Sequence, residues 1–201
     1  MSKGRESSAP EDSKRPMRDD ALRRRRALDP GELSRISKKV EENLVSMPEF
    51  KAASLVVSYC ALKDEVQTRP IIERAIAEGK RVAVVVADPK KRTLSFSEID
   101  SFEGDLEPGS FGIMEPKAGR GRRVPLDEAD VVLVPLVAWD DRGHRLGYGA
   151  GYFDRGLKGA DGVLKVGLAM ESQRVEAIPQ TRHDVPLDVI VTEKRVLRVN
   201  K

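Results

Sequence analysis

A glycine-rich segment between opposite charges carries the strongest chemical signal in this sequence. It begins at Arg145, ends at Asp154, and places three glycines at alternate positions with tyrosines among them. Glycine adopts positive φ and lets backbone N–H groups come close to an anion, so this composition is typical of a phosphate-binding loop. The spacing matches neither the dinucleotide fingerprint GxGxxG nor the phosphate loop that ends in Gly-Lys-Ser/Thr. Three clustered glycines are equally consistent with a plain turn, and the flanking charges favour a binding loop.

Two carboxylates are candidate ligands for a magnesium ion beside this loop. Asp154 follows the last glycine, and Asp188 directly precedes a predicted strand, from which we expect its side chain to reach the same crevice. Mg²⁺ commonly takes only one or two protein carboxylates and completes its shell with water and phosphate oxygens. The alternative for Asp154 is a first-turn helix acid that the macrodipole stabilises. His183 lies beside Asp184 and is expected to be exposed to solvent.

Other reactive residue types form no constellation that indicates a further reaction. The sequence contains no GxSxG nucleophile motif, and Cys60 has no evident partner histidine. One cysteine and two histidines do not indicate zinc. The acidic segment that contains Glu65 follows a predicted strand. Taken alone, it is interpreted more simply as acidic residues at the start of a helix, stabilised by the helix dipole, than as part of a binding site. From the residues alone, the chemistry favours an enzyme that uses a magnesium-bound nucleotide.

Short apolar runs rich in β-branched residues predict the strands that position this loop. The first two, at 54–60 and 80–87, flank a helix expected to begin near Thr68 and to end at Gly79. Strand, helix and strand in this order form a βαβ unit with a right-handed crossover. The other expected elements are two helices between 18 and 46 with a turn at 29–31, strands at 93–99, 129–135, 165–170 and 189–192, and a helix at 152–157.

Together these elements predict an α/β fold. We expect a three-layer α/β/α sandwich around a largely parallel, Rossmann-like sheet, because continuous apolar strands alternate with helices. Ligands of such folds bind at the carboxyl ends of the strands, and the glycine loop comes soon after the run at 129–135. The length of 201 residues suits one domain, expected over 14–201, behind a disordered tail over 1–13.

Composition and charge restrict the location and the partners of the protein. The chain has one cysteine and no apolar run of about 20 residues, so we expect a cytoplasmic protein with no disulfide and no membrane segment. The net charge of +3 is local, because residues 14–26 hold seven basic and two acidic side chains. The four arginines at 23–26 lack aromatic neighbours, which favours a solvated helix face over RNA contact. A monomer without a nucleic-acid partner is expected.

Six motifs in order resemble those of the 5-formyltetrahydrofolate cyclo-ligase family, also called methenyltetrahydrofolate synthetases. The motifs are Lys14–Arg18, Tyr59–Thr68, Phe111–Pro116, Val134–Asp140, Arg145–Arg155, and His183–Asp188 followed by Val191–Glu193. The resemblance covers most of the chain, and the glycine loop is its most specific part. It implies an ATP- and Mg²⁺-dependent cyclisation of 5-formyltetrahydrofolate to 5,10-methenyltetrahydrofolate, with release of ADP and phosphate, through a phosphorylated formyl (iminophosphate) intermediate. Alternatives are a paralogue that keeps the ATP site but acts on another substrate, and a non-enzymatic RNA-associated member.

The same resemblance implies roles for individual residues. Arg145 and Tyr152 would be catalytic, and Asp154 and Asp188 would hold Mg²⁺. The residues implied in ATP binding are Lys14, Arg18, Arg145, Leu146, Gly147, Tyr148, Gly149, Ala150, Gly151, Tyr152 and Phe153. Those implied in folate binding are Cys60, Glu65, Tyr148, Gly149, Ala150, Gly151 and Tyr152. At Phe153 the family usually has tyrosine, so this chain lacks a hydroxyl there, and Trp139 stands where phenylalanine is commoner.

Overall fold

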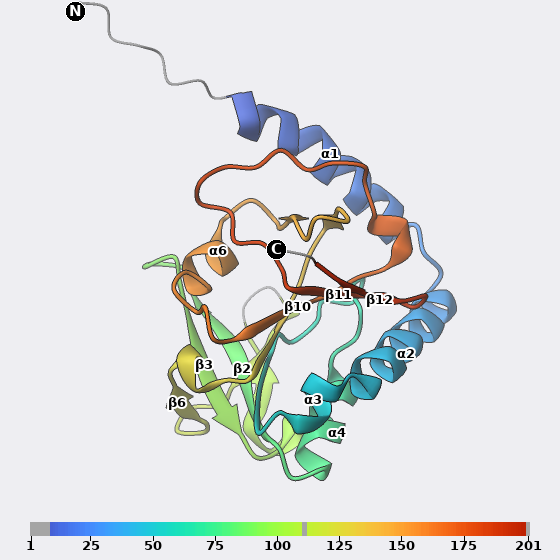
Figure 1. The fold of residues 1–201 in the computed structure, drawn as a ribbon. Helices are drawn as coiled ribbons and strands as arrows, with labels where there is room; N and C mark the ends of the chain where they lie inside the picture. Colours follow the sequence, from blue (N-terminus) through green and yellow to red (C-terminus); the bar gives the residue numbers. More distant parts are fainter. Residues whose placement is uncertain (1–8, 110–111, 200–201) are drawn as a thin grey trace, which may run out of the picture.

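The computed structural model describes residues 9–109 and 112–199, in which three helices precede the first strand and strands and short helices follow (Figure 1). The strands are β1 (Leu55–Ser58), β2 (Arg81–Asp88), β3 (Thr93–Ile99), β4 (Leu106–Pro108), β5 (Met114–Pro116), β6 (Arg122–Val124), β7 (Val131–Val134), β8 (Ala138–Trp139), β9 (Arg145–Leu146), β10 (Leu164–Leu168), β11 (Val189–Val191) and β12 (Val196–Arg198). The α-helices are α1 (Ala9–Arg26), α2 (Pro30–Ser46), α3 (Pro48–Ala52), α4 (Arg69–Ala77), α5 (Phe102–Asp105) and α6 (Tyr152–Gly156). Two short 3₁₀ helices are η2 (Leu126–Glu128) and η3 (Glu171–Gln173).

An eight-stranded sheet forms the centre of the protein, in the order β12-β11-β10-β7-β1-β2-β3-β6. The strands from β11 to β2 run parallel to one another. Strand β12 at one edge is antiparallel to β11, and at the other side of the sheet β3 is antiparallel to both β2 and the edge strand β6. The hairpins β4–β5 and β8–β9 form two separate small sheets. The prediction of an α/β fold with a largely parallel sheet is therefore confirmed.

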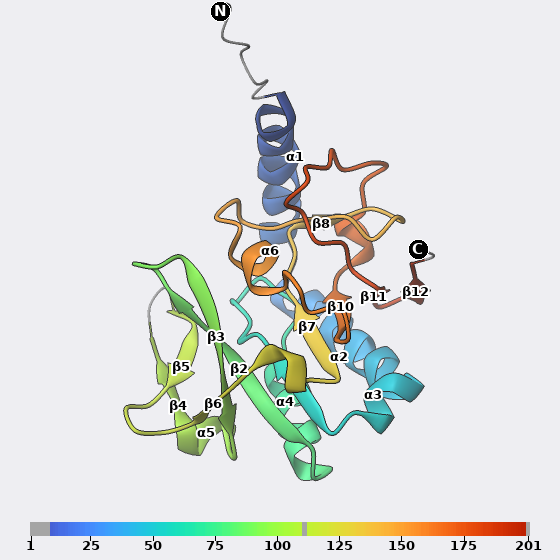
Figure 2. The ribbon, with the colours of Figure 1, turned by 60° about the vertical axis from the view of Figure 1, so that its left-hand side comes forward.

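Both faces of the sheet are buried, as the continuous apolar strands require. On one face, Val56 of β1 belongs to a cluster with Leu44 of α2 and Ile72 of α4. On the other face, Val57 belongs to a cluster with Leu157, which directly follows α6. Helices α2, α3 and α4 thus cover one face, and α6 with its neighbouring loops covers the other (Figure 2).

The turn predicted at 29–31 separates α1 from α2. Asp29 is the N-cap of α2, and its Oδ1 accepts hydrogen bonds from Gly31 N at 2.8 Å and Glu32 N at 3.2 Å. Pro30 is the first residue of α2, where its missing N–H costs nothing. Helix α1 begins at Ala9, so residues 9–13 of the expected disordered tail are helical instead. The rest of that tail, residues 1–8, lies outside the described residues.

Helix α1 packs at the carboxyl end of the parallel strands, where ligands of α/β folds bind. Ala21 of α1 forms a small apolar cluster with Ala138 of β8, Leu146 of β9 and Ile178. Figure 1 shows α1 beside the orange and red segment that leads to β11. Within residues 9–109 and 112–199, no helix has the length and apolarity needed to cross a bilayer.

Candidate active site

One face of helix α1 brings three cations toward the glycine loop. Lys14, Arg18, Ala21 and Arg25 are spaced four, three and four residues apart, so their side chains lie on the same side of the helix. The exposed fractions of Lys14, Ala21 and Arg25 are only 4%, 1% and 2%. The small side chain of Ala21 lets the helix approach the β8–β9 hairpin closely, and cations lie on either side of this contact.

A cavity of about 500 Å³ lies between α1, the glycine loop and the carboxyl ends of β1 and β7. Its charged lining residues are Lys14, Arg18, Glu65, Glu115, Arg145, Asp154 and Asp184. Its apolar and aromatic lining includes Tyr59, Cys60, Leu62, Val85, Ala87, Leu94, Ile113 and Pro135. The glycine loop contributes every residue from Arg145 to Asp154. The cavity therefore combines both signs of charge with an apolar wall.

The glycine loop has a backbone conformation that its glycines permit. Gly149 and Gly151 have φ angles of 98° and 65°, in the region where glycine is favoured. Arg18 Nε donates a hydrogen bond to Gly147 O at 2.8 Å. A Cβ atom built on Gly149 would lie 3.2 Å from Arg18 Cζ. Helix α1 thus contacts the loop directly, and the missing side chain at Gly149 makes room for the guanidinium.

Arg145 and Asp154 form an ion pair that joins the two ends of the loop. Arg145 Nη2 lies 2.8 Å from Asp154 Oδ1, which also accepts a hydrogen bond from Val185 N at 3.1 Å. Arg145 Nη1 donates to Val185 O. Burial lowers the pKa of Arg145, and the charges of Asp154 and Asp184 oppose that shift. A guanidinium stays protonated in proteins, so a fixed cation lies beside a carboxylate in the cavity.

A second ion pair joins α1 to the segment before β11. Lys14 Nζ lies 2.6 Å from Asp184 Oδ2, which also accepts a hydrogen bond from Thr181 N at 2.7 Å. Burial alone would raise the pKa of Asp184, but the hydrogen bonds from Lys14 and Thr181 outweigh it, and the pKa is lowered. Asp184 is therefore an anion in the same cavity as Lys14 and Arg145.

A buried carboxylate lies at the other side of the glycine loop, after β1. Glu65 is 5% exposed, and its Oε1 accepts a hydrogen bond from Tyr148 OH at 2.7 Å, while Oε2 accepts one from Leu62 N at 2.9 Å. Burial raises the pKa of Glu65, and both hydrogen bonds oppose this shift. Cys60 lines the same cavity, and burial raises the pKa of its thiol to about 12. The thiol is therefore uncharged at neutral pH. Cys60 also lacks the lowered pKa that a reactive cysteine needs, so we interpret it as a lining residue.

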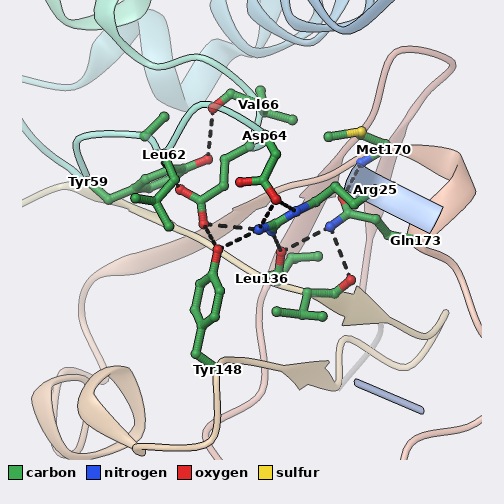
Figure 3. A network of polar contacts seen from close by, with 12 residues as sticks. Arg25, Tyr59, Leu62, Asp64, Val66, Leu136, Tyr148, Met170 and Gln173 are labelled. Carbon is green, nitrogen blue, oxygen red and sulfur yellow. Dashed lines mark hydrogen bonds and ion pairs between the residues drawn. The ribbon is translucent and has the colours of Figure 1, made fainter. Parts of the chain in front are cut away.

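The prediction that the arginines at 23–26 form a solvated helix face is wrong for Arg25. Figure 3 shows its guanidinium enclosed by polar groups, and Nε and Nη2 donate to Asp64 Oδ2 at 3.1 and 3.0 Å. Nη2 also donates to Tyr148 OH at 2.6 Å. The other three arginines are exposed, as expected. Helical spacing from Lys14 is the signal that could have identified Arg25.

Asp188 does not line this cavity, so the predicted pairing with Asp154 is wrong. Strand β11 runs parallel to β10, and Asp188 directly precedes β11, which puts it at the amino end of the strand, away from the ligand edge. Its Oδ2 accepts a hydrogen bond from Lys165 N at 2.8 Å and lies 3.7 Å from Lys165 Nζ. Of Asp184 and Asp188, it is Asp184 that lines the same cavity as Asp154.

The structure brings the other predicted site residues together. Lys14, Arg18, Cys60, Glu65 and every residue from Arg145 to Asp154 line one cavity. The ring of Tyr152 faces Arg155 at 5.5 Å, and Phe153 packs against both core clusters. Trp139 is fully buried and donates from Nε1 to Met170 O at 3.0 Å, while His183 is exposed as predicted. Phe111 lies outside the described residues.

Comparison with known proteins gives consistent matches over nearly the whole chain. A model of the 5-formyltetrahydrofolate cyclo-ligase family matches residues 10–193. The chain is 33% identical over 176 residues to the 5-formyltetrahydrofolate cyclo-ligase of Escherichia coli (strain K12). This match covers 86% of this chain and 96% of that protein. It is 33% identical over 156 residues to the enzyme of the same name from Haemophilus influenzae, covering 76% and 83% of the two chains.

Solved structures agree with this match. The 5,10-methenyltetrahydrofolate synthetase of Aquifex aeolicus superposes with a TM-score of 0.82 and 39% identity, over 94% of this chain and 93% of that one. A synthetase from Mycoplasma pneumoniae superposes with a TM-score of 0.72 at 22% identity, over 90% of this chain and 98% of that one, which shows the same fold.

Proposed function

Since the chain belongs to the 5-formyltetrahydrofolate cyclo-ligase family, it is an enzyme that converts 5-formyltetrahydrofolate to 5,10-methenyltetrahydrofolate, and we propose that it couples this ring closure to cleavage of ATP. The amide-like formyl oxygen is a poor leaving group and must be activated. In the proposed reaction the γ-phosphoryl group moves from ATP to that oxygen, and nitrogen 10 of the folate attacks the activated carbon. The oxygen then departs with the phosphate, leaving methenyltetrahydrofolate and ADP.

The cations of the cavity support the ATP-binding part of this proposal. Lys14, Arg18 and Arg145 line one cavity with the glycine loop, and a triphosphate needs such a concentration of positive charge. Phosphoryl transfer depends mainly on positioning and on electrostatic stabilisation of the transferred group. We assign Arg145 the role of contacting the transferred phosphoryl group, because its ion pair with Asp154 fixes its orientation. Tyr152 lines the cavity on the same loop and is assigned to the reacting end of the substrates.

The carboxylates of the cavity fit a magnesium ion bound with the phosphates. Asp154 and Asp184 both line it, and Mg²⁺ usually takes one or two protein carboxylates beside substrate phosphate. No group of three or more histidine, cysteine or acidic residues arranged for a metal occurs in residues 9–109 and 112–199. A site completed by the substrate therefore suits this cavity better than an all-protein site. The ion would neutralise charge on the transferred phosphoryl group.

Glu65 supports the folate-binding part. A buried carboxylate is a strong acceptor for N–H donors such as those of a pterin ring, and the apolar wall beside it suits the ring itself. The glycine loop contacts the phosphate side through Gly147, which accepts a hydrogen bond from Arg18. It contacts the folate side through Tyr148, which donates to Glu65. This single loop in contact with both sides is the observation that carries the proposal.

The direct test mixes the purified protein with 5-formyltetrahydrofolate and Mg²⁺-ATP and follows the absorbance of the methenyl product. We expect one ADP for each methenyltetrahydrofolate formed, and no product when either ATP or Mg²⁺ is left out. Folded protein that forms no chromophore would overturn the proposal. ATP cleavage that does not depend on folate would instead indicate a paralogue that acts on another substrate.

Substitution of Glu65 tests the placement of the folate. Glu65→Gln should raise KM for 5-formyltetrahydrofolate by about tenfold or more, because a hydrogen bond to a charged group is lost, and should change KM for ATP much less. Glu176→Gln is the matched control, since Glu176 is exposed and is not among the cavity-lining residues described. A larger change in KM for ATP than for folate would contradict the placement.

A further inference from the structure

Arg25 is outside the cavity lining but contacts two residues that belong to it. Glu65 and Tyr148 line the cavity, whereas Arg25 is not among the described residues that do. We propose that Arg25 is a positioning residue for the folate side: its buried guanidinium keeps Glu65 an anion and holds the Tyr148 phenol against it. This inference rests on the proposed function, in which Glu65 accepts hydrogen bonds from the folate ring.

The geometry around Arg25 is that of a fixed guanidinium with several acceptors (Figure 3). Nε and Nη2 donate to Asp64 Oδ2 at 3.1 and 3.0 Å, and Nη2 donates to Tyr148 OH at 2.6 Å. Nη1 lies 3.7 Å from Glu65 Oε1 and donates to Leu136 O at 3.5 Å. Tyr148 OH in turn donates to Glu65 Oε1 at 2.7 Å. The phenol hydroxyl therefore accepts from the cation and donates to the carboxylate at once.

The backbone on the far side of Arg25 is itself held in place. Gln173 Nε2 donates to Leu136 O at 3.0 Å and to Val137 O at 3.1 Å. The acceptor of Arg25 Nη1 is thus fixed by the segment that follows β10. A guanidinium with this many fixed partners has little freedom to move, so it can determine where the Tyr148 ring lies.

Arg25 supplies the positive charge in an otherwise acidic group. The titratable and charged groups that face Glu65 are Arg25 from α1, Tyr148 from the glycine loop, Tyr59 at the end of β1, and Asp64 from its own segment. Burial raises the pKa of Glu65, the hydrogen bonds from Tyr148 and Leu62 and the charge of Arg25 lower it, and Asp64 raises it again. Without Arg25, Glu65 would lose the cation that opposes burial and the charge of Asp64, and the exposed Arg26, whose Nε lies 3.9 Å from Asp64 Oδ2, would pair with Asp64 and not with Glu65. Glu65 would then take up a proton at higher pH and lose its strength as an acceptor.

Helix α1 consequently contacts both halves of the site through one face. Arg18 donates to Gly147 O on the phosphate side, and Arg25 donates to Tyr148 OH on the folate side. Two adjacent residues of the glycine loop are therefore held by two arginines on the same face of α1. This arrangement explains why a charged residue is buried in α1 although burial of an unpaired charge is costly.

The test compares Arg25→Met with wild type across pH. The competent form of Glu65 is the anion, so kcat/KM for folate falls as pH drops through the pKa of Glu65. In Arg25→Met this acidic limb should move upward by about one pH unit, and KM for folate at about pH 6 should rise about tenfold while KM for ATP changes less than about threefold. Arg23→Met is the matched control, because Arg23 is exposed on the same helix and forms an ion pair with Asp20, one turn away. Its profile should overlay that of wild type.

A titration of Glu65 by carbon-13 NMR makes the inference independent of turnover. The carboxyl resonance should titrate at higher pH in Arg25→Met, and in a Glu65→Gln background Arg25→Met should produce no further shift of the activity profile. An unchanged titration of Glu65, or a loss of thermal stability with an unchanged pH profile, would overturn the role of Arg25 even if the enzyme is active. Absence of methenyl product from wild type would overturn the proposed function instead.

A milder substitution covers the case in which Arg25→Met does not fold. Arg25→Lys keeps the charge but cannot donate to Asp64 and Tyr148 through a planar fork. We expect it to retain the wild-type acidic limb to within about half a pH unit, with a moderate rise in KM for folate. A shift of the limb as large as one pH unit in this charged variant would show that charge is not what Arg25 supplies.

Discussion

Arg145 and Asp154 stand nine residues apart at opposite ends of the glycine loop, yet their side chains meet at 2.8 Å. The ion pair therefore holds the two ends of the loop together. Because Asp154 Oδ1 also accepts from Val185 N, the same carboxylate joins the loop to the segment before β11. Asp154 therefore has a structural role in addition to the proposed role beside the metal.

Replacement of Asp154 should affect catalysis more than substrate binding. Asp154→Asn leaves Arg145 without its counter-charge and weakens the proposed metal position, so kcat should fall by about a hundredfold or more. The measurement is the rate of methenyl product formation at saturating ATP, Mg²⁺ and folate. Arg23→Gln, at an exposed position of α1, should remain near wild type. Equal losses in the two variants would contradict this division between site and surface.

The two candidate metal carboxylates can be separated by their magnesium requirement. Asp184→Asn should raise the Mg²⁺ concentration needed for half-maximal activity about tenfold, because Asp184 lines the cavity. Asp188→Asn should leave that concentration unchanged and lower the melting temperature, because Asp188 accepts a hydrogen bond from Lys165 N and pairs with its buried ammonium. Magnesium titrations of activity and thermal melts of both variants decide the matter. If Asp188→Asn raised the magnesium requirement and Asp184→Asn did not, the metal ligands would be Asp154 and Asp188, as the sequence predicted.

Two glycines of the loop should differ in their tolerance of a side chain. At Gly149 the backbone φ is 98°, which is unfavourable for alanine, and a Cβ there would lie 3.2 Å from Arg18 Cζ. Gly149→Ala should therefore raise KM for ATP about tenfold. At Gly147 a Cβ would meet no atom within 4 Å, and Gly147→Ala should have a smaller effect. Steady-state kinetics and calorimetric binding of ADP measure both. Similar losses in the two variants would mean that the room beside Arg18 is unimportant.

The single cysteine should resist alkylation in the folded protein. Cys60 is 5% exposed and the pKa of its thiol is raised to about 12, so at about pH 8 only about one part in 10⁴ is thiolate. Modification by iodoacetamide should therefore be at least about a hundredfold slower than in urea-unfolded protein. Mass spectrometry of timed samples measures the rate. Rapid modification of native protein would show that this wall of the cavity opens.

Asp140 should make the stability of the fold sensitive to acid. Burial alone would raise its pKa, but hydrogen bonds from Ile178 N, Arg142 and His144 N hold the pKa below its ordinary value of 3.8. The folded state therefore binds the proton less readily than the unfolded state, so this contribution to the free energy of unfolding is complete above the ordinary value and is lost as pH falls through the folded-state value.

Asp140→Asn should accordingly lower the free energy of unfolding by about 1–3 kcal/mol at neutral pH, and the difference from wild type should shrink below about pH 4. Urea unfolding at several pH values measures it. Asp127→Asn, at an exposed position, should have little effect at any pH. A difference that stays constant down to about pH 3 would mean that the ionisation of Asp140 is not what stabilises the fold.

Much of the sheet was predictable because burial on both faces demands continuous apolar strands. The runs that became β1, β2, β7 and β10 are of this kind, and the parallel pairing of β1 with β2 follows from the helix α4 that connects them. Strand β6 was not predicted, since Arg122 and Arg123 are exposed and only Val124 is buried. This strand forms because it pairs with β3. Three residues are too few to show the alternation of apolar and polar side chains from which such a strand could be predicted.

The site residues that are adjacent in the chain could be predicted from the sequence. Residues whose position in the cavity depends on helical spacing or on the direction of a strand could not. The glycine loop carries its own pattern, and Lys14 and Arg18 were found through resemblance. Arg25 was missed because four consecutive arginines look alike until helical spacing singles one out. Asp188 was chosen without regard to the direction of β11, which puts it at the amino end of the strand, whereas Asp184, in the segment before that strand, pairs with Lys14 and lines the cavity.

The contact between Lys14 and Asp184 spans 170 positions of the chain. A protein leaves the ribosome from its N-terminus, so the first helix is made long before the carboxylate that its lysine meets. A nascent chain therefore cannot complete this site until translation is nearly finished. A premature stop before Asp184 would release a product whose first helix has lost the partner of its buried lysine, and such a product should be a substrate for proteases instead of a partly active enzyme.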